Sequence, residues 1–153
     1  MKKNYLLPHR YMKIGLFMLV QFIIKACIAF LGMAPSIEIS FPYIYNDLFT
    51  SNSWFSIANG EDVFMEIWML GVFSSLIFIA LSKEKVEDEM IMQIRFQSML
   101  FSLRCTAAIF IFETIFIFGF AYVYCLGALF YIFLIVFILR FRYVLHKLNK
   151  IEK

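Results

Sequence analysis

The stretch that decides the fold is Cys105–Leu139, which reads CTAAIFIFETIFIFGFAYVYCLGALFYIFLIVFIL and contains no lysine or arginine. A helix needs about 20 apolar residues to cross the hydrocarbon of a bilayer, so this stretch is too long for one span and too short for two. We therefore expect the first of its two helices to begin earlier, near Gln97. The run is interrupted at Gly119-Phe120-Ala121, which predicts a tight turn between the two helices.

The distribution of positive charge predicts the topology. Twelve of the fourteen lysines and arginines fall into three groups, whereas residues 26–82 and 105–139 contain none. Cytoplasmic loops retain lysine and arginine because translocating them is unfavourable, so all three groups are expected in the cytoplasm. The sequence thus predicts an all-α membrane protein with four transmembrane helices and both termini cytoplasmic. The groups are Lys2, Lys3, Arg10 and Lys13; Lys83, Lys85 and Arg95; and Arg140, Arg142, Lys147, Lys150 and Lys153.

Composition supports the same class of protein. Apolar residues make up 63% of the chain, aromatic residues 20%, and the mean hydropathy is +0.82. These values exceed what a soluble domain of this length needs for its core, so the surplus is expected to face lipid. The net charge of +3 is explained by the cytoplasmic cations and gives no support to nucleic-acid binding. The three cysteines lie in apolar stretches and suggest neither a disulfide framework nor a metal site.

The four predicted spans fill a single membrane domain, residues 1–153. An N-terminal signal peptide is the competing interpretation of the first span, but its apolar stretch is long for one and contains Gln21 and Lys25. Gly32 and Pro35 are expected to end this span. The loop that follows is rich in aromatic residues and is expected to lie in the outer membrane interface. The predicted spans are 14–33, 63–82, 97–118 and 121–139, with an external loop 34–62 and a cytoplasmic loop 83–96.

Polar residues inside the predicted spans are the first candidate site. Each charged side chain would cost about 2.5–3.5 kcal/mol at the centre of a helix. Three of these charged residues, Lys25, Glu66 and Glu113, lie in the outer third of the bilayer when their depth is counted at about 1.5 Å per residue from the outer helix ends. With two uncharged polar residues, they form the predicted intramembrane polar cluster, which consists of Gln21, Lys25, Glu66, Thr106 and Glu113.

Glu113 is expected to point into the helix bundle. It shares a helical stripe with Ser98, Ser102 and Thr106, whose small side chains allow a neighbouring helix to approach closely. Lys25 lies at a similar depth and is its expected ion-pair partner. Such a pair serves either as a proton or ion relay or as a contact that fixes helix register. The lack of broken helices and of paired repeats favours the second interpretation.

Arg104 lies near the cytoplasmic end of its span, where its long side chain can reach the inner headgroups. It projects about 180° away from Glu113 and joins Gln93 and Gln97 on another side of the helix. The fourth helix, an oligomer partner and lipid headgroups are the alternatives for what this side contacts.

The cytoplasmic loop predicts an amphipathic helix that runs without interruption into the third span. Its apolar residues recur every four positions, and its acids cluster near the start, where the helix dipole favours them. Glu84, Glu87 and Asp88 share one side of this helix, which suggests divalent-cation binding, but no histidine joins them and a solvated acidic surface is favoured. We expect the helix to dock a cytoplasmic partner through Val86, Glu87, Asp88, Met90 and Ile94.

Two segments carry a family resemblance. The loop sequence Ser82-Lys83-Glu84-Lys85, followed by Glu87-Asp88-Glu89, and the segment Arg140-Phe141-Arg142-Tyr143-Val144-Leu145 resemble small four-helix membrane proteins of the Bacteroidota with an SKEKxEDE loop motif. That family has no assigned activity. The resemblance implies location in the bacterial inner membrane. The genes of this family look as if they often lie beside a gene for a small helix-turn-helix regulator. The resemblance therefore implies a sensing or regulatory role.

Catalysis finds no support in the sequence. It contains no nucleophile elbow, glycine-rich phosphate loop, HExxH motif or paired histidine and cysteine spacing. No catalytic, cofactor-binding or metal-ligating residues are therefore predicted. We expect a non-enzymatic regulatory, sensory or scaffolding protein, whose partners are the lipid bilayer and a cytoplasmic protein or a second copy of the chain. The alternative is a small transporter or channel subunit that uses Lys25 and Glu113.

Overall fold

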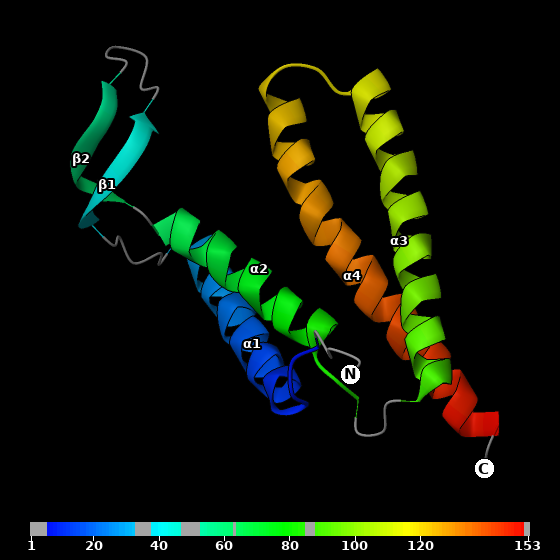
Figure 1. Cartoon of the computed structure of the whole chain (residues 1–153). Coiled ribbons are helices and arrows are strands. Elements are labelled where there is room, and N and C mark those ends of the chain that lie inside the picture. The colour runs from blue at the N-terminus through cyan, green and yellow to red at the C-terminus, as the bar shows by residue number, and fades with distance from the viewer. Residues whose placement is uncertain (1–5, 33–37, 47–52, 63, 85–87, 152–153) are drawn as a thin grey trace. The chain divides into compact units, whose positions relative to one another are not determined.

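The computed structural model describes residues 6–32, 38–46, 53–62, 64–84 and 88–151. All four helices in these ranges are long and apolar enough to cross a membrane, as the sequence predicts. The elements, in chain order, are α1 Arg10–Phe30, β1 Glu38–Asn46, β2 Ser53–Asp62, α2 Phe64–Leu81, α3 Glu89–Phe116 and α4 Phe120–Ile151 (Figure 1).

The chain forms two compact units. The larger consists of Met1–Phe17 and Phe73–Lys153 and contains the start of α1, the second half of α2, and all of α3 and α4. The smaller, Met18–Val72, contains the rest of α1, both strands and the first half of α2. The sequence predicts a single domain, whereas these two units are defined by which residues pack against one another.

Within the larger unit, α3 and α4 form an antiparallel hairpin. The apolar run is divided where the sequence predicts, because α3 ends at Phe116, α4 begins at Phe120, and Gly119 between them has a φ of +75°. This left-handed conformation strains residues with a side chain, so glycine fits the turn. Across it, the hydroxyl oxygens of Thr114 and Tyr122 lie 3.3 Å apart.

The start of α3 confirms an uninterrupted helix but moves its first residue. Asp88 is the N-cap, and its carboxylate accepts a 2.7 Å hydrogen bond from the backbone N–H of Glu89. Side-chain capping satisfies one of the N–H groups that a helix leaves without an internal partner. Ser82, Lys83 and Glu84 precede the cap and are not helical.

Small residues form much of the interior of the larger unit. The fully buried side chains among the described residues are serines, which let helix backbones approach closely. They are Ser75 in the second half of α2, Ser82 directly after its end, and Ser98 and Ser102 on α3. Apolar side chains complete the core: Leu76, Ala80, Ile94, Leu129, Phe137 and Phe141.

Gly15 of α1 shows how close one approach is. A Cβ atom at this position would lie 2.9 Å from the carbonyl oxygen of Ser75 and 3.0 Å from side-chain carbons of Phe78 and Ile79. The contact of α1 with α2 in this unit therefore depends on the absence of a side chain. One turn earlier, the ring of Tyr11 packs 5.7 Å from that of Phe78.

In the smaller unit, residues 34–62 contain strands where the sequence predicts only a loop. β1 and β2 pair antiparallel, with Glu38 opposite Asp62 and Asn46 opposite Ser53, and the register shifts between Ile39 and Phe41. Both strands of a two-stranded hairpin are edge strands, so Pro42 is tolerated although it donates no hydrogen bond.

The helices of the smaller unit contact through Phe22 of α1 and Trp68 and Gly71 of α2. The indole N–H of Trp68 donates a 3.0 Å hydrogen bond to the carbonyl oxygen of Phe22. The Phe22 ring occupies the space beside Gly71 that a Cβ atom would need. At the end of α1, Gly32 has a φ of +77°, which agrees with the predicted end of the first span.

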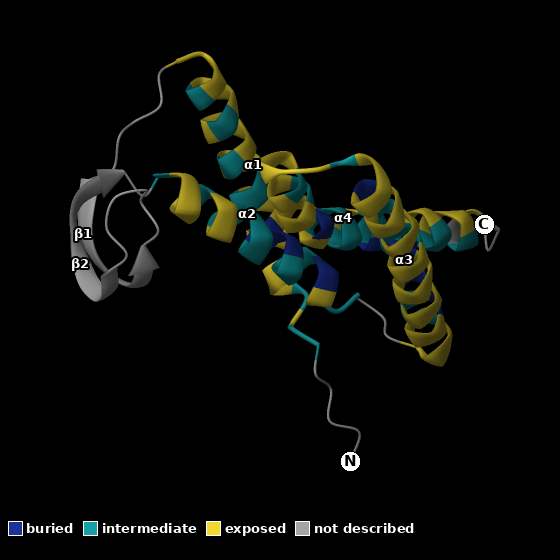
Figure 2. Cartoon of the chain, turned by 90° about the horizontal axis from the view of Figure 1, so that it is seen from above, coloured by how far each residue is buried: buried dark blue, intermediate teal, exposed yellow. Residues whose placement is uncertain are grey.

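Large apolar side chains remain on the outside of the helices. In the most apolar window of each helix, between 6% and 22% of the residues are buried (Figure 2). Leu70, Phe112, Phe130 and Leu139 are each at least 59% exposed. Soluble proteins seldom expose so much contiguous apolar surface, whereas lipid-facing helices require it.

Candidate functional site

The carboxyl end of α2 is held by an arginine from α3. A helix end leaves backbone carbonyls without internal donors, and α2 has no basic residue in its last turn. The guanidinium of Arg95 donates hydrogen bonds to the carbonyl oxygens of Ala80, at 2.9 Å, and Ser82, at 3.1 Å. It also lies 4.6 Å from the centre of the Phe141 ring of α4. One side chain thus joins three helices.

A second arginine fixes the segment after α2. Arg142 of α4 forms an ion pair with Glu84, with nitrogen and oxygen 3.3 Å apart, and contacts the sulfur of Met12. Glu84 is therefore not part of the solvated acidic surface that the sequence favours. Its side chain is 17% exposed and satisfied within the chain.

The N-terminal segment pairs with the same region. Leu7 donates its backbone N–H to the carbonyl of Leu81 and accepts from the N–H of Lys83, at 2.9 and 2.8 Å. The Nδ1 atom of His9 lies 2.9 Å from the carbonyl oxygen of Lys83. We call residues Leu7, His9, Lys83, Glu84, Arg95 and Arg142 the connector cluster, because they link the N-terminus, α2, α3 and α4.

The residues expected to dock a partner do not form one exposed stripe. Val86 and Glu87 lie outside the described residues. Asp88 caps α3, Met90 is 46% exposed, and Ile94 is 8% exposed. Ile94, which is expected to contact a partner, instead packs in the core of the larger unit. The connector cluster holds α2 and α4 against the first turns of α3. Ile94 is therefore covered by these helices.

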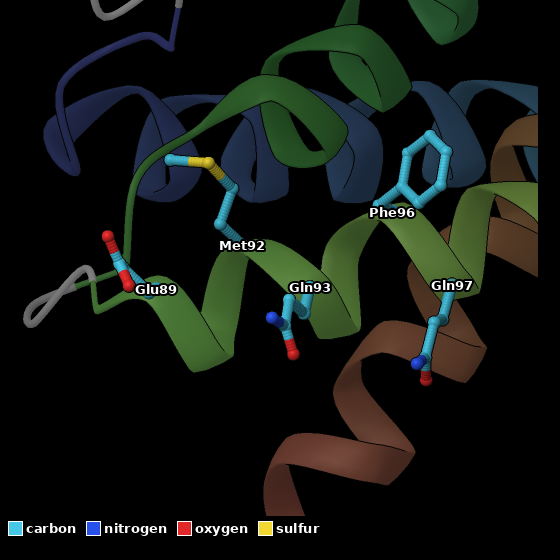
Figure 3. Close-up of a pocket in the computed structure, with 5 residues that line it drawn as sticks. All are labelled: Glu89, Met92, Gln93, Phe96 and Gln97. Atoms are coloured by element: carbon cyan, nitrogen blue, oxygen red, sulfur yellow. The ribbon is translucent and has the colours of Figure 1, made fainter. Parts of the chain in front are cut away.

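The exposed side of the first turns of α3 is adjacent to the residues that are expected to dock a partner. Glu89, Met92, Gln93, Phe96 and Gln97 line a shallow groove along the start of α3 (Figure 3). Their spacing of three and four residues places them on one side of a helix. Met92 and Phe96 are 51% and 59% exposed, so the groove combines large apolar groups with amides and a carboxylate.

Glu113 is buried in the larger unit, on the side of α3 that also buries Ser98 and Ser102. Thr106, on the same stripe, is half-buried and donates its hydroxyl to the carbonyl of Ser102 at 2.9 Å. Glu113 is 7% exposed, and its Oε2 atom has no hydrogen-bond partner among the described residues. A buried carboxyl group without a partner is energetically costly, which makes it a candidate for function.

The other members of the predicted polar cluster belong to the smaller unit. Gln21, Lys25 and Glu66 are exposed on α1 and α2. The Lys25 ammonium lies 5.4 Å from the centre of the Phe22 ring, one turn of the same helix away. The ion pair between Lys25 and Glu113 links residues of different units and stays a prediction.

Among the described residues, no group of three histidine, cysteine or acidic side chains is placed to hold a metal ion. The comparisons with known proteins give no family: no family model matches the chain, and neither a curated protein nor a solved structure is significantly similar to it. The class that the fold itself defines is a four-helix protein whose helices can each cross a membrane.

Proposed function

We propose that the chain is a multi-pass protein of the bacterial inner membrane, with both termini cytoplasmic, that acts as a non-enzymatic regulatory, sensory or scaffolding component through a cytoplasmic partner. Four apolar helices with exposed apolar surfaces support the membrane placement. The three groups of lysine and arginine support the orientation. In this topology, the connector cluster lies at the cytoplasmic end.

The observation that carries the partner proposal is the groove at the start of α3. This helix has 28 residues. It is therefore about 42 Å long, roughly 12 Å more than the hydrocarbon thickness. With its outer end at the membrane surface, residues 89–96 extend into the cytoplasm and carry Met92 and Phe96 with them. Exposed apolar groups bordered by polar ones are typical of protein interaction sites.

Photo-crosslinking tests the partner. A photoreactive amino acid at Gln93 in the membranes of the native host should yield a defined protein adduct. Met92→Ser with Phe96→Ser should reduce that adduct at least tenfold. Met99→Ser is the matched control, because Met99 is 52% exposed on the same helix, inside the predicted span. Equal crosslinking in the double variant and the control would contradict docking at the groove.

Topology is tested separately. Single cysteines at Ser51 and Lys85, introduced into a cysteine-free background, should react with an impermeant thiol reagent from opposite sides of the membrane. Reaction of both from the outside in intact cells would refute the proposed orientation.

A small transporter or channel subunit is the second candidate, and Glu113 is the observation that favours it. A buried carboxyl group without a hydrogen-bond partner is suited to binding a proton or cation in transit. In proteoliposomes, Glu113→Gln should then abolish proton or cation flux. Glu66→Gln, the same change at an exposed carboxylate, should leave the flux intact. Wild-type vesicles without flux would exclude this candidate.

The predicted pair of Lys25 and Glu113 has its own test. Lys25→Met should destabilise the protein, and adding Glu113→Gln should restore part of the loss, because an unpaired buried charge costs more than a neutral group. Additive losses in the double variant would argue against direct contact.

A further inference from the structure

Four arginines on α3 and α4 divide into two kinds. Arg95 and Arg142 are engaged inside the connector cluster, one with the α2 carbonyls and one with Glu84. Arg104 and Arg140 are exposed, and neither forms an ion pair or hydrogen bond with the described part of the chain. Their charges are available to a ligand.

Phe101 is a neighbour of both arginines, of Arg140 by contact and of Arg104 by its position on α3. The Arg140 guanidinium lies over the Phe101 ring, 3.8 Å from its centre. Arg104 follows Phe101 by three residues on α3, which places the two on neighbouring positions of one helix side. The aromatic contact holds the Arg140 group in place while leaving its N–H donors unpaired.

The general direction of helical side chains favours an approach of the two guanidinium groups. Side chains on a helix lean toward its N-terminus. Because α3 and α4 are antiparallel, Arg104 leans toward the connector cluster, and Arg140 leans away from it, toward Phe101. The backbone positions therefore differ in depth more than the charges do.

The depth of this pair fits the inner edge of the hydrocarbon, just below the headgroups. Counted back from Phe116 at about 1.5 Å per residue, Phe101 lies roughly 22 Å from the outer end of α3, and the inner hydrocarbon boundary lies near 30 Å. Counted from Phe120 in the same way, the backbone of Arg140 lies roughly 30 Å from the outer end of α4, at that boundary, and the Arg104 side chain leans toward it. Beside the pair, Leu100, Leu103 and Leu139 are exposed apolar groups that acyl chains can cover.

We propose that Phe101, Arg104 and Arg140 form a binding site for the phosphate of an anionic phospholipid of the inner leaflet. Guanidinium groups match the geometry of phosphate oxygens and bind them through paired hydrogen bonds. An anionic lipid is preferred over a zwitterionic one, because the ammonium group of the latter is repelled by two arginines. This site rests on the proposed membrane placement and is independent of any protein partner.

The test is lipid binding by the full chain in a neutral detergent, measured by native mass spectrometry. The wild type should retain phosphatidylglycerol in preference to phosphatidylcholine. Arg104→Gln with Arg140→Gln should weaken phosphatidylglycerol binding about 30-fold, at the usual contribution of each arginine to anionic lipid binding. Arg10→Gln with Lys147→Gln is the matched control, because it removes two exposed cations elsewhere and should retain the preference.

Three outcomes would overturn the proposal. Equal loss in the control variant would mean that net charge alone attracts the lipid. Displacement of phosphatidylglycerol by millimolar inorganic phosphate would identify a site for soluble phosphate. Unchanged binding in the Arg104 and Arg140 variant would exclude these residues. If that variant does not fold, Arg104→Lys with Arg140→Lys decides, because it keeps both charges, loses the paired geometry and should weaken binding several-fold. Topology and crosslinking are separate readouts, so failure of the partner proposal leaves this result interpretable.

Discussion

Replacing Arg95 is expected to give the largest loss of stability among exposed and half-buried polar residues of the larger unit. Arg95→Met removes two hydrogen bonds from a charged donor to the carbonyls of Ala80 and Ser82. These residues are 4% and 2% exposed, so water does not readily replace the donor. Hydrogen bonds to charged groups contribute about 1.5–3 kcal/mol each, and the contact with Phe141 adds about 0.5–2 kcal/mol.

Since contributions of one side chain are not additive, we expect the free energy of unfolding to fall by about 3–5 kcal/mol. Arg95→Lys should lose roughly half as much, because one ammonium group keeps the charge but cannot match both carbonyls as a planar fork does. The measurement is unfolding in mixed micelles, followed by circular dichroism. Gln93→Met is the control, an exposed neighbour expected to change stability by less than about 0.5 kcal/mol. Equal stability of Arg95→Met and this control would refute the structural role of Arg95.

Three further changes test the packing of the larger unit, each by the same unfolding measurement. Gly15→Leu should cost at least about 1–3 kcal/mol, because even its Cβ meets the Ser75 carbonyl at 2.9 Å, and a neutral effect would contradict this contact. Asp88→Ala should cost about 0.5–2 kcal/mol and Asp88→Asn much less, since asparagine also caps helices; equal losses would argue against capping. In a double-mutant cycle, Glu84 and Arg142 should couple by less than about 1 kcal/mol, because the pair is partly exposed, and stronger coupling would indicate a more buried ion pair.

Helix positions could be predicted from the sequence because lipid-crossing length and apolar composition are local properties. The division of the long apolar run at Gly119 follows from the same argument, since two helices need a turn and glycine permits the required conformation. The buried stripe of Ser98, Ser102 and Glu113 follows from helical spacing.

The strands were missed although a signal for them is present. In β1, Ile39, Phe41, Tyr43 and Tyr45 alternate with other residues, a period of two that is typical of strands. The abundance of turn-forming residues in 34–62 and the presence of Pro42 favoured a loop instead. A proline is compatible with an edge strand, so it is weak evidence against a two-stranded hairpin.

The connector cluster could not be predicted from spacing. The sequence places Arg95 in a group of cytoplasmic cations, and nothing local distinguishes it from the other members of these groups, such as Arg140. Its role depends on the end of α2 lying beside α3, which is a tertiary property. One signal was available: α2 ends without a basic residue or glycine to satisfy its last carbonyls, so a donor from elsewhere is required.

The continuity of α3 also has a mechanical consequence. Its 28 residues include neither glycine nor proline, the usual causes of a bend. A rod of this kind transmits a change of tilt from one end to the other. With the outer end fixed, a rotation of about 5° over roughly 42 Å displaces the first turn of the helix sideways by about 3.7 Å. A change in bilayer thickness that alters the tilt of α3 would therefore move Met92 and Phe96, which lie roughly 36 and 30 Å from the fixed end, sideways by about 3 Å.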